Sequence, residues 1–388
     1  MLETHLIPRA KQNDSEQFNL FGGPSVHVST EGIKYSGSKL KLLPYILSVV
    51  HSLPVKRIFD GFSGTTRVSQ TFAKCDYQVI ANDLAVWSKV FGECYLKGKK
   101  SNQLQEKIDY LNCLKGYEGW FSEHYGGKAN GGLSLHSNGK KKIWQIHNTK
   151  KLDAIRPEID KVAESSVEKS ILLTSLILAL DKVDSTLGHY ASYLREWSPR
   201  SFNTMKLLMP LIETKSIHHK VMNKNIFQVL HKIKADLSYF DPPYGSNNEK
   251  MPPSRVRYAS YYHIWKTICL NDEPELAGKT NRRADCNDRV AGSIFEEFRK
   301  NTKGKFIALT AIERLIKECP SQYILLSYNN GGRATKEEIC AIISKQCKKA
   351  QIFSIDYKRN VMSGMRWTHD WTKSNEGKNT EFLFLMEK

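Results

Sequence analysis

The 388-residue sequence predicts an α/β fold, and two parts of the chain carry most of that prediction. Residues 57–60 form a short apolar strand, followed by a small-residue loop at 61–65, a helix to about residue 74 and a second strand at 77–81. Strand, glycine loop, helix and strand in this order open a Rossmann-like parallel sheet. Far downstream, residues 235–240 alternate apolar and polar side chains and are rich in aromatic rings, which predicts a further strand.

The other expected elements fit the same plan. An apolar-periodic helix at 38–52 precedes the first strand, and Ser38 is its expected cap. Residues 1–30 are polar and contain an early Gly22-Gly23-Pro24 break, so we expect a loose N-terminal arm. The C-terminal part returns to sheet chemistry, with strands expected at 323–328, 350–356 and 381–386 and a helix at 335–347.

Between the two strand-forming parts the composition changes. From about residue 98 to 150 the chain is rich in Gly, Lys, Asn and Ser, which indicates loops around a hairpin. Residues 153–197 carry Leu and Ile at helical spacing and are predicted to be helical. We therefore divide the chain into an arm (1–30), a sheet-containing domain (31–98 and 214–388) and an inserted, mostly helical and loop region (99–213).

The chain is strongly basic. It has 58 lysines and arginines against 40 aspartates and glutamates, which gives a net charge of +18 and an isoelectric point of about 9.4. A polyanionic partner such as nucleic acid is the simplest explanation, because counterions released from phosphates favour binding. The alternative is a basic protein without such a partner.

Other residue patterns exclude several classes of protein. Eight cysteines are scattered without a CxxC pair, which fits reduced thiols in a cytosol and neither a zinc ribbon nor a disulfide framework. The histidines show no HExxH spacing, so we predict no metal. The longest apolar run, 171–180, is too short to span a bilayer, and the N-terminus lacks the pattern of a signal peptide. We expect a cytoplasmic protein without membrane association.

The segment Asp241-Pro242-Pro243-Tyr244 carries the clearest chemical signal. It follows the strand at 235–240, and open α/β sheets bind their ligands at the carboxyl ends of strands. The prolines donate no hydrogen bonds and restrict the backbone, so the loop presents carbonyl oxygens at fixed angles. A carboxylate and a carbonyl can accept both N–H groups of an amine, while the tyrosine ring stacks on a flat heterocycle. This predicts a pocket for an exocyclic amine on a base; the alternative is a turn in which Asp241 caps the bend.

A second predicted site lies at the first strand, where the loop Asp60-Gly61-Phe62-Ser63-Gly64-Thr65 opens a helix. Glycines let the backbone approach a ligand, and a helix N-terminus favours negative charge. Asp83 ends the second strand, where nucleoside-binding sheets place an acceptor for ribose hydroxyls. The alternative is a tight turn with a solvated Asp83. A hydrolase nucleophile elbow at Ser63 is excluded because Thr65 stands where glycine is required, and no GxxxxGK[ST] phosphate loop is present.

Together these motifs resemble those of DNA adenine-N6 methyltransferases that use S-adenosylmethionine (SAM). Residues 32–39 are similar to the N-terminal K-Y-x-G-S-K motif of that family, residues 59–65 to its D-P-F-S-G-T-G loop and residues 241–244 to its D-P-P-Y. The order of the motifs, with a long insert between glycine loop and catalytic loop, resembles the alpha group. Residues 184–197 and 327–330 also resemble the family.

Two residues depart from the family pattern. Gly61 replaces the usual proline of the glycine loop, and Thr66 replaces its last glycine. Thr66 adds bulk where the family often has none.

The resemblance implies a SAM-binding catalytic domain and a target-recognition role for the insert. It implies that the cofactor is held by Tyr35, Gly37 and Lys39 at its methionine end, by Asp60, Phe62, Ser63 and Gly64 along its path and by Asp83 at the ribose. The segment 221–226 is similar to the strand end that contacts the cofactor's adenine, which makes Asn225 a further candidate. The alternative for Asn225 is a helix cap.

The implied reaction moves a methyl group from SAM to the N6 amine of adenine in duplex DNA. We expect Asp241, Pro242, Pro243 and Tyr244 to be catalytic. The Asp241 carboxylate and the Pro242 carbonyl would each accept one N–H and aim the nitrogen lone pair at the methyl group, without a covalent enzyme intermediate. Because N6 cannot be reached inside the base stack, the adenine must flip out, with Tyr244 stacking on it.

Partners and alternatives follow from the same motifs. Base-specific contacts would come from the Gly- and Lys-rich residues 126–151 or from the Tyr- and Arg-containing segment 255–283. We expect a monomer or weak dimer, with a cognate restriction endonuclease as a further candidate partner. One alternative is a SAM-dependent N-methyltransferase of RNA or of a protein amide, in which Asn more often replaces the aspartate. Another is a catalytically inactive DNA-binding protein on the same fold, which the intact Asp241–Tyr244 motif and Asp83 disfavour.

Overall fold

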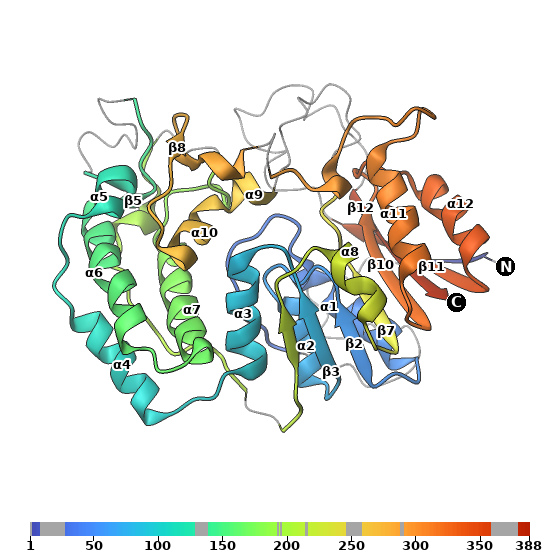
Figure 1. Cartoon of the computed structure of the whole chain (residues 1–388), viewed down its shortest axis with the longest axis horizontal. Helices are drawn as coiled ribbons and strands as arrows, with labels where there is room; N and C mark the ends of the chain where they lie inside the picture. The colour runs from blue at the N-terminus through green and yellow to red at the C-terminus, as the bar shows by residue number, and fades with distance from the viewer. Residues whose placement is uncertain are drawn as a thin grey trace.

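An eight-stranded sheet runs through the molecule, and a group of helices lies beside one end of it (Figure 1). The structure is a computed structural model that describes residues 2–7, 28–128, 139–191, 194, 196–213, 216–245, 258–287, 291–357 and 379–388. The strands lie in the order β1-β11-β12-β10-β7-β2-β3-β6. Their bounds are Leu2–Ile7 (β1), Arg57–Asp60 (β2), Gln78–Asn82 (β3), Lys220–Met222 (β6), Leu237–Phe240 (β7), Tyr323–Asn329 (β10), Lys349–Tyr357 (β11) and Asn379–Glu387 (β12).

The sheet is mostly parallel, as predicted. Within it only β12 runs against its two neighbours, β10 and β11, and every other pair of adjacent strands is parallel. All four residues of β7 and three of the four in β2 are buried. Strands that are buried on both faces are typical of parallel sheets covered by helices.

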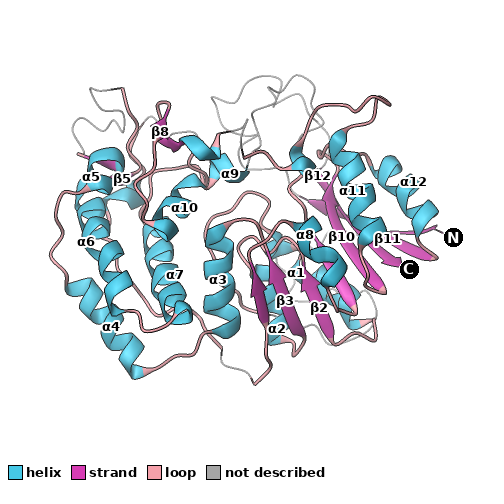
Figure 2. Ribbon diagram, viewed as in Figure 1, coloured by secondary structure: helices cyan, strands magenta, loops and turns pink. Residues whose placement is uncertain are grey.

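Helices cover both faces of the sheet (Figure 2). On one face, Val50 and Phe72 pack with Leu237 of β7 in a single apolar cluster. On the other face, Ile312 and Ile339 pack with Phe240. The helices that supply these side chains are α1 (Leu43–His51) and α2 (Arg67–Lys74) on the first face and α11 (Ile307–Glu318) and α12 (Lys336–Gln346) on the second.

A third apolar cluster holds the inserted helices together and joins them to the sheet domain. Trp144, Leu172 and Trp265 are buried in it, and Phe91 of α3 (Val86–Lys97) extends it toward the sheet. The helices of this group are α4 (Asn102–Cys113), α5 (Trp120–Tyr125), α6 (Ile146–Val162) and α7 (Ser166–Lys182) of the insert, joined by α10 (His263–Leu270), which follows β7 in the chain. They lie to the left of α3 in Figure 1.

Four local predictions are wrong. Residues 2–7 are not part of a loose arm, because β1 pairs in parallel with β11 from Leu2↔Ala350 onward and bonds to the backbone groups along the outer side of that strand. The Gly22-Gly23-Pro24 break lies outside the described residues. The expected hairpin is absent from the described residues of 98–150, where β4 (Gly126–Gly127) and β5 (Trp144–Gln145) pair in parallel and two helices, α4 and α5, precede them. Residues 129–138 are not described.

The other two errors concern helix ends. The helical segment expected at 153–197 begins at Ile146, breaks between α6 and α7 and stops at Lys182, because Asp184 turns away to bind groups from other parts of the chain. The expected helix at 38–52 divides into a short 3-10 turn, Lys39–Lys41, and α1. Ser38 precedes that turn, but its side chain makes no capping hydrogen bond.

Candidate active site

Two loops leave the carboxyl edge of the sheet where the strand order reverses. From β2 the chain builds outward to β3 and β6 on one side, and it later returns to β7 on the other side of β2. Asp60 at the end of β2 is paired with Tyr239 of β7, so the loop 61–65 and the loop Asp241–Tyr244 begin side by side. This edge is where open α/β sheets bind their ligands.

Asp83 ties the glycine loop to β3. The Gly64 amide donates to Asp83 Oδ2 and the Ala85 amide donates to Oδ1, both at 2.8 Å. Burial raises the pKa of the Asp83 carboxyl, and these backbone hydrogen bonds oppose that effect. A carboxylate can accept about four hydrogen bonds, so Asp83 keeps acceptor capacity for a ligand. The predicted ribose acceptor therefore lies directly beside the loop.

The structure explains one departure from the family pattern and shows how the other is accommodated. A Cβ at Gly61 would lie 2.8 Å from the Phe240 ring, so a proline there would displace that buried ring. Thr66 has φ 61°, a left-handed conformation that β-branched residues rarely adopt and glycine adopts freely. Its side chain is fixed nevertheless, donating to the Thr65 carbonyl and accepting from Gln70 Nε2.

Asp60 is a buried acid beneath this loop. Ser69 Oγ donates to Asp60 Oδ2 at 2.6 Å, whereas Asp60 Oδ1 is buried and has no hydrogen-bond partner. Burial raises the pKa of Asp60 to about 7, the Ser69 hydrogen bond opposes this, and the charges of Asp241 and Asp83 add to it.

Asp241 is paired with Lys39. Lys39 Nζ lies 3.1 Å from Asp241 Oδ1, and the two side chains are 4% and 19% exposed. Burial raises the pKa of Asp241 to about 7, and Lys39 opposes this effect while Glu381 adds to it. Burial alone would lower the pKa of Lys39, but the Asp241 and Glu381 carboxylates outweigh that effect and raise it. Asp241 is therefore neither packed into the core nor freely solvated.

Glu381 is a site residue that our sequence analysis missed. It lies on β12, and its carboxylate accepts from Lys39 Nζ at 3.4 Å and from Tyr244 Oη at 3.4 Å. Lys39 Nζ also donates to Tyr244 Oη at 2.5 Å, and the Tyr244 ring lies 4.9 Å from that of Tyr328. A single acid at the head of the apolar run Phe382-Leu383-Phe384-Leu385-Met386 was the only available signal.

Tyr35 lies in an aromatic cluster next to the glycine loop. Its ring is 5.4 Å from that of Tyr258 and 5.7 Å from that of Trp87. A Cβ built on Gly64 would stand 3.6 Å from the Tyr35 ring. The structure thus brings together the N-terminal motif and the glycine loop, as the resemblance implied.

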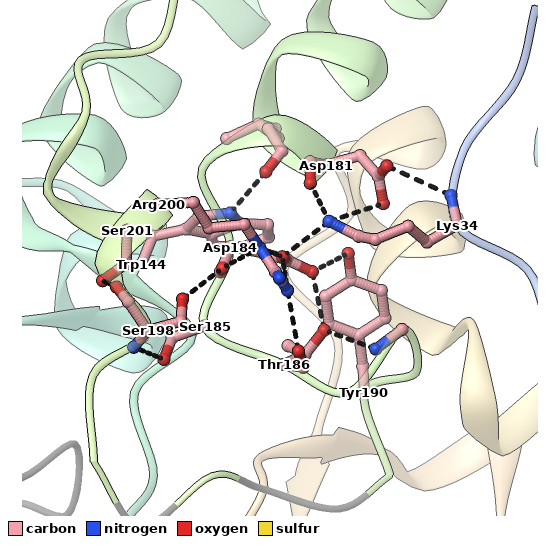
Figure 3. A network of polar contacts seen from close by, with 12 residues as sticks. Lys34, Trp144, Asp181, Asp184, Ser185, Thr186, Tyr190, Ser198, Arg200 and Ser201 are labelled. Atoms are coloured by element: carbon pink, nitrogen blue, oxygen red, sulfur yellow. Dashed lines mark hydrogen bonds and ion pairs between the residues drawn. The ribbon is translucent and has the colours of Figure 1, made fainter. Parts of the chain in front are cut away.

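Lys34, the residue before Tyr35, connects the N-terminal motif to the inserted helices through a network of polar contacts (Figure 3). Lys34 Nζ donates to Asp184 Oδ1 at 2.8 Å and to the Asp181 carbonyl. Arg200 donates to the same Asp184 oxygen from two nitrogens, and Tyr190 Oη donates to Asp184 Oδ2. Asp184 is buried, so this network fixes the segment after α7 against the residue that precedes Tyr35.

Two other predicted site residues already have partners within the protein. The Asn225 side chain accepts from the Phe227 amide and caps α8 (Ile226–Val229), as the alternative for that residue proposed. Arg283, in the candidate base-reading segment, is buried between Asp272 and Asp285, so its guanidinium is already paired. Residues 129–138 and 255–257 of the two candidate segments lie outside the described residues.

The described residues contain no group of three or more His, Cys, Asp or Glu side chains that could hold a metal ion. No helix among them is both long and apolar enough to cross a lipid bilayer.

Comparisons with known proteins agree with this geometry. The sequence profile of a family described as D12 class N6 adenine-specific DNA methyltransferase matches residues 35–297. Modification methylase StsI of Streptococcus sanguinis is 31% identical over 348 residues, which cover 84% of this chain and 47% of that protein. Type II methyltransferase M.NlaIII of Neisseria lactamica is 28% identical over 369 residues, 92% of this chain and 99% of that protein. The chain thus spans about half of the first relative and nearly all of the second.

The matched segment begins at Tyr35 and contains the glycine loop, Asp83 and the Asp241–Tyr244 loop. The predicted α/β methyltransferase fold and enzyme class are confirmed, because the family match and the parallel sheet with its two loops agree. The chain belongs to the D12 class of N6 adenine-specific DNA methyltransferases.

Proposed function

We propose that the chain transfers a methyl group from SAM to the N6 amine of an adenine flipped out of duplex DNA. The observation that carries this proposal is the position of Asp241. It belongs to the family's catalytic motif, lies at the switch point of the sheet and keeps a partly exposed carboxylate held by Lys39. A carboxylate that is fixed before substrate arrives is what positioning catalysis requires.

The residues around the glycine loop fit SAM as cofactor. The buried Asp60 Oδ1 lacks a partner, the Gly64 backbone faces the Tyr35 ring, and Asp83 has free lone pairs for ribose hydroxyls. Bound there, SAM would supply a sulfonium-activated methyl group: the N–C bond would form as the S–C bond breaks, S-adenosylhomocysteine would leave, and the displaced proton of the amine would pass to water. We propose that Tyr35, Gly37, Phe62, Ser63 and Gly64 form the rest of its site.

Lys39 is assigned a different role from the one its motif implied. Its Nζ is engaged by Asp241, Tyr244 and Glu381, so we place it beside the reacting amine and not at the methionine end of the cofactor. Asn225 Oδ1 already caps α8, so its side-chain NH₂ is the group we propose for the cofactor's adenine.

At the amine, the chain supplies two acceptors and an aromatic face. The ionised Asp241 carboxylate and the Pro242 carbonyl each accept one N–H, which orients the nitrogen lone pair. Pro243 contributes no backbone donor that could compete. The Tyr244 ring stacks on the flipped adenine, and its hydroxyl is held by Lys39 and Glu381.

The test is methyl transfer from labelled SAM to duplex DNA, tRNA, rRNA and protein. We expect label in the adenines of DNA. Asp241→Ala should lower transfer by at least about a hundredfold, the typical effect of removing one preorganised polar group, while SAM binding by calorimetry and the circular dichroism spectrum are retained. Full activity of that variant would contradict the mechanism, and preferential labelling of RNA or protein would contradict the substrate.

The relatives suggest a biological setting. Several are named as modification methylases or type II methyltransferases, so we propose that this chain protects a recognition sequence against a cognate restriction endonuclease in the cytoplasm. Sequencing DNA from cells that express it, with modified bases identified, would give the recognition sequence. We further propose that the chain acts as a monomer or weak dimer, with target recognition by the insert.

A further inference from the structure

A single cation is shared by two carboxylates at the candidate active site. Lys39 Nζ lies 3.1 Å from Asp241 Oδ1 and 3.4 Å from Glu381 Oε2, and its side chain is 4% exposed. One positive charge therefore faces two negative ones in a site that largely excludes water. Because Coulomb energies add, the negative charge of Glu381 offsets part of the stabilisation that Lys39 gives to the Asp241 carboxylate.

Glu381 is held in place by the sheet. It lies opposite Asn329 in the register of β10 and β12, and Asn329 Nδ2 donates to Glu381 Oε1 at 3.2 Å. Tyr244 Oη donates to the same oxygen. The five residues after Glu381 are all buried and apolar, so an acid here costs desolvation energy that its three donors must offset. Glu381 also lies outside residues 35–297, the segment that carries the family match.

We propose that Glu381 is a positioning residue that competes with Asp241 for the charge of Lys39 and thereby keeps the Asp241 carboxylate basic enough to grip the amine. The inference rests on the proposed function, since it concerns the same reaction. A neutralised ion pair is a weak acceptor, whereas a carboxylate with only part of a counter-ion accepts N–H groups more strongly. A charged acceptor holds the N–H of the amine more strongly than a neutral one does, so the reaction rate should rise with the basicity of Asp241.

The surrounding charges are consistent with this role. Burial raises the pKa of Asp241 to about 7, Lys39 lowers it and Glu381 raises it. The other titratable groups whose charges interact with Asp241 are Asp60 and the hydroxyls of Tyr35, Tyr239, Tyr244 and Tyr258. Two carboxyls, Asp60 and Glu381, act on Asp241 in this way, and of these two it is Glu381 that contacts Lys39 directly.

The test compares the pH profile of kcat in wild type and Glu381→Gln, with SAM and DNA saturating. We expect the acid limb of Glu381→Gln to move by about one unit to lower pH, because Asp241 then holds all of the Lys39 charge. Its plateau kcat should fall severalfold, while KM for SAM and DNA changes less than about twofold, since a weaker acceptor for the amine slows the chemical step only. Glu381→Asp, which keeps the charge, should retain the wild-type limb.

The sign of the shift separates this role from a structural one. If Glu381 only tethered Lys39, its loss would leave Asp241 without a cation and move the limb to higher pH; that result, or an unmoved limb, overturns the proposal. Glu387→Gln, on the same strand and paired with Lys349, is the matched control and should leave the profile unchanged.

A second variant keeps the test decisive if Glu381→Gln fails to fold. Asn329→Ala removes a donor from Glu381, which should then draw more strongly on Lys39, so its acid limb should move to higher pH. An unmoved limb or a shift to lower pH in Asn329→Ala overturns the proposal. Asp241→Ala is measured in parallel. If this variant is fully active, the proposed function fails. If it is inactive but the acid limbs of Glu381→Gln and Asn329→Ala do not move as expected, only the present inference about Glu381 fails.

Discussion

Tyr35 and Tyr262 stack with ring centroids 4.6 Å apart and planes inclined by 28°. The Ser36 amide also donates to Tyr262 Oη at 2.6 Å. Tyr262 comes directly before α10, so a residue far along the chain fixes both the ring and the backbone of the N-terminal motif. The proposed cofactor site is therefore shaped by aromatic packing between two distant segments.

Tyr262→Phe should weaken SAM binding while preserving the stack. The Ser36 amide loses its acceptor, a loss of about 1 kcal/mol or more that corresponds to roughly a fivefold to tenfold higher Kd. Calorimetry with SAM measures this. Tyr110→Phe, at an exposed tyrosine on α4, is the control and should bind as wild type does. An unchanged Kd in Tyr262→Phe would show that this hydrogen bond does not support the cofactor site.

Gly37→Ala should be more destabilising than its backbone angle alone explains. Gly37 has φ 79°, and a Cβ there would lie 2.8 Å from Tyr258 Oη. Gly304 has φ 76° with nothing within 4 Å of its Cβ position, so Gly304→Ala isolates the conformational cost of about 1 kcal/mol. We expect Gly37→Ala to lose about 1–3 kcal/mol more in chemical denaturation and to bind SAM less tightly. Equal losses in the two variants would mean that Tyr258 moves aside freely.

Asp184→Asn should destabilise the junction between insert and sheet domain. Asp184 is buried and neutralises Lys34 and Arg200, so its loss leaves two cations without their shared partner. Lys34 and Arg200 are 36% and 37% exposed and Lys34 keeps Asp181, so the expected cost is about 1–3 kcal/mol in the free energy of unfolding. Glu164→Gln is the control, since Glu164 is exposed and Lys107 keeps Glu168; it should cost less than about 1 kcal/mol. Similar losses in the two variants would show that the Asp184 network stabilises the protein no more than an exposed ion pair does.

Asp60→Asn should stabilise the protein in a pH-dependent way. The pKa of Asp60 is raised by burial to about 7, so the folded state favours its protonated form and wild type loses stability as pH rises from about 4 to about 7. An asparagine still accepts from Ser69 and never ionises. Its advantage should grow over that pH range to at most about 4 kcal/mol and then level off. Denaturant melts at pH 4.5, 6 and 8 measure this, and an advantage that does not change with pH would refute the raised pKa.

Local sequence patterns were sufficient for the central strands and their loops. The strand at 57–60 and the helix at 335–347 were predicted within a residue or two, because buried parallel strands and amphipathic helices have distinct periodicities. The insert was harder. Its helices near 102–125 lie in a Gly- and Lys-rich stretch, and they are stabilised by packing against α6 and α7 more than by their own periodicity.

The sequence alone determined the chemistry of this protein: an Asp-Pro-Pro-Tyr loop after a strand, a glycine loop after another, and a basic surface. Those features are local, since they depend on neighbouring residue types. Only the tertiary structure decided that Lys39 pairs with Asp241, that Glu381 shares Lys39 and that β1 closes the edge of the sheet. These contacts join residues hundreds of positions apart, and the order of strands in the sheet, which no local pattern specifies, brings them together.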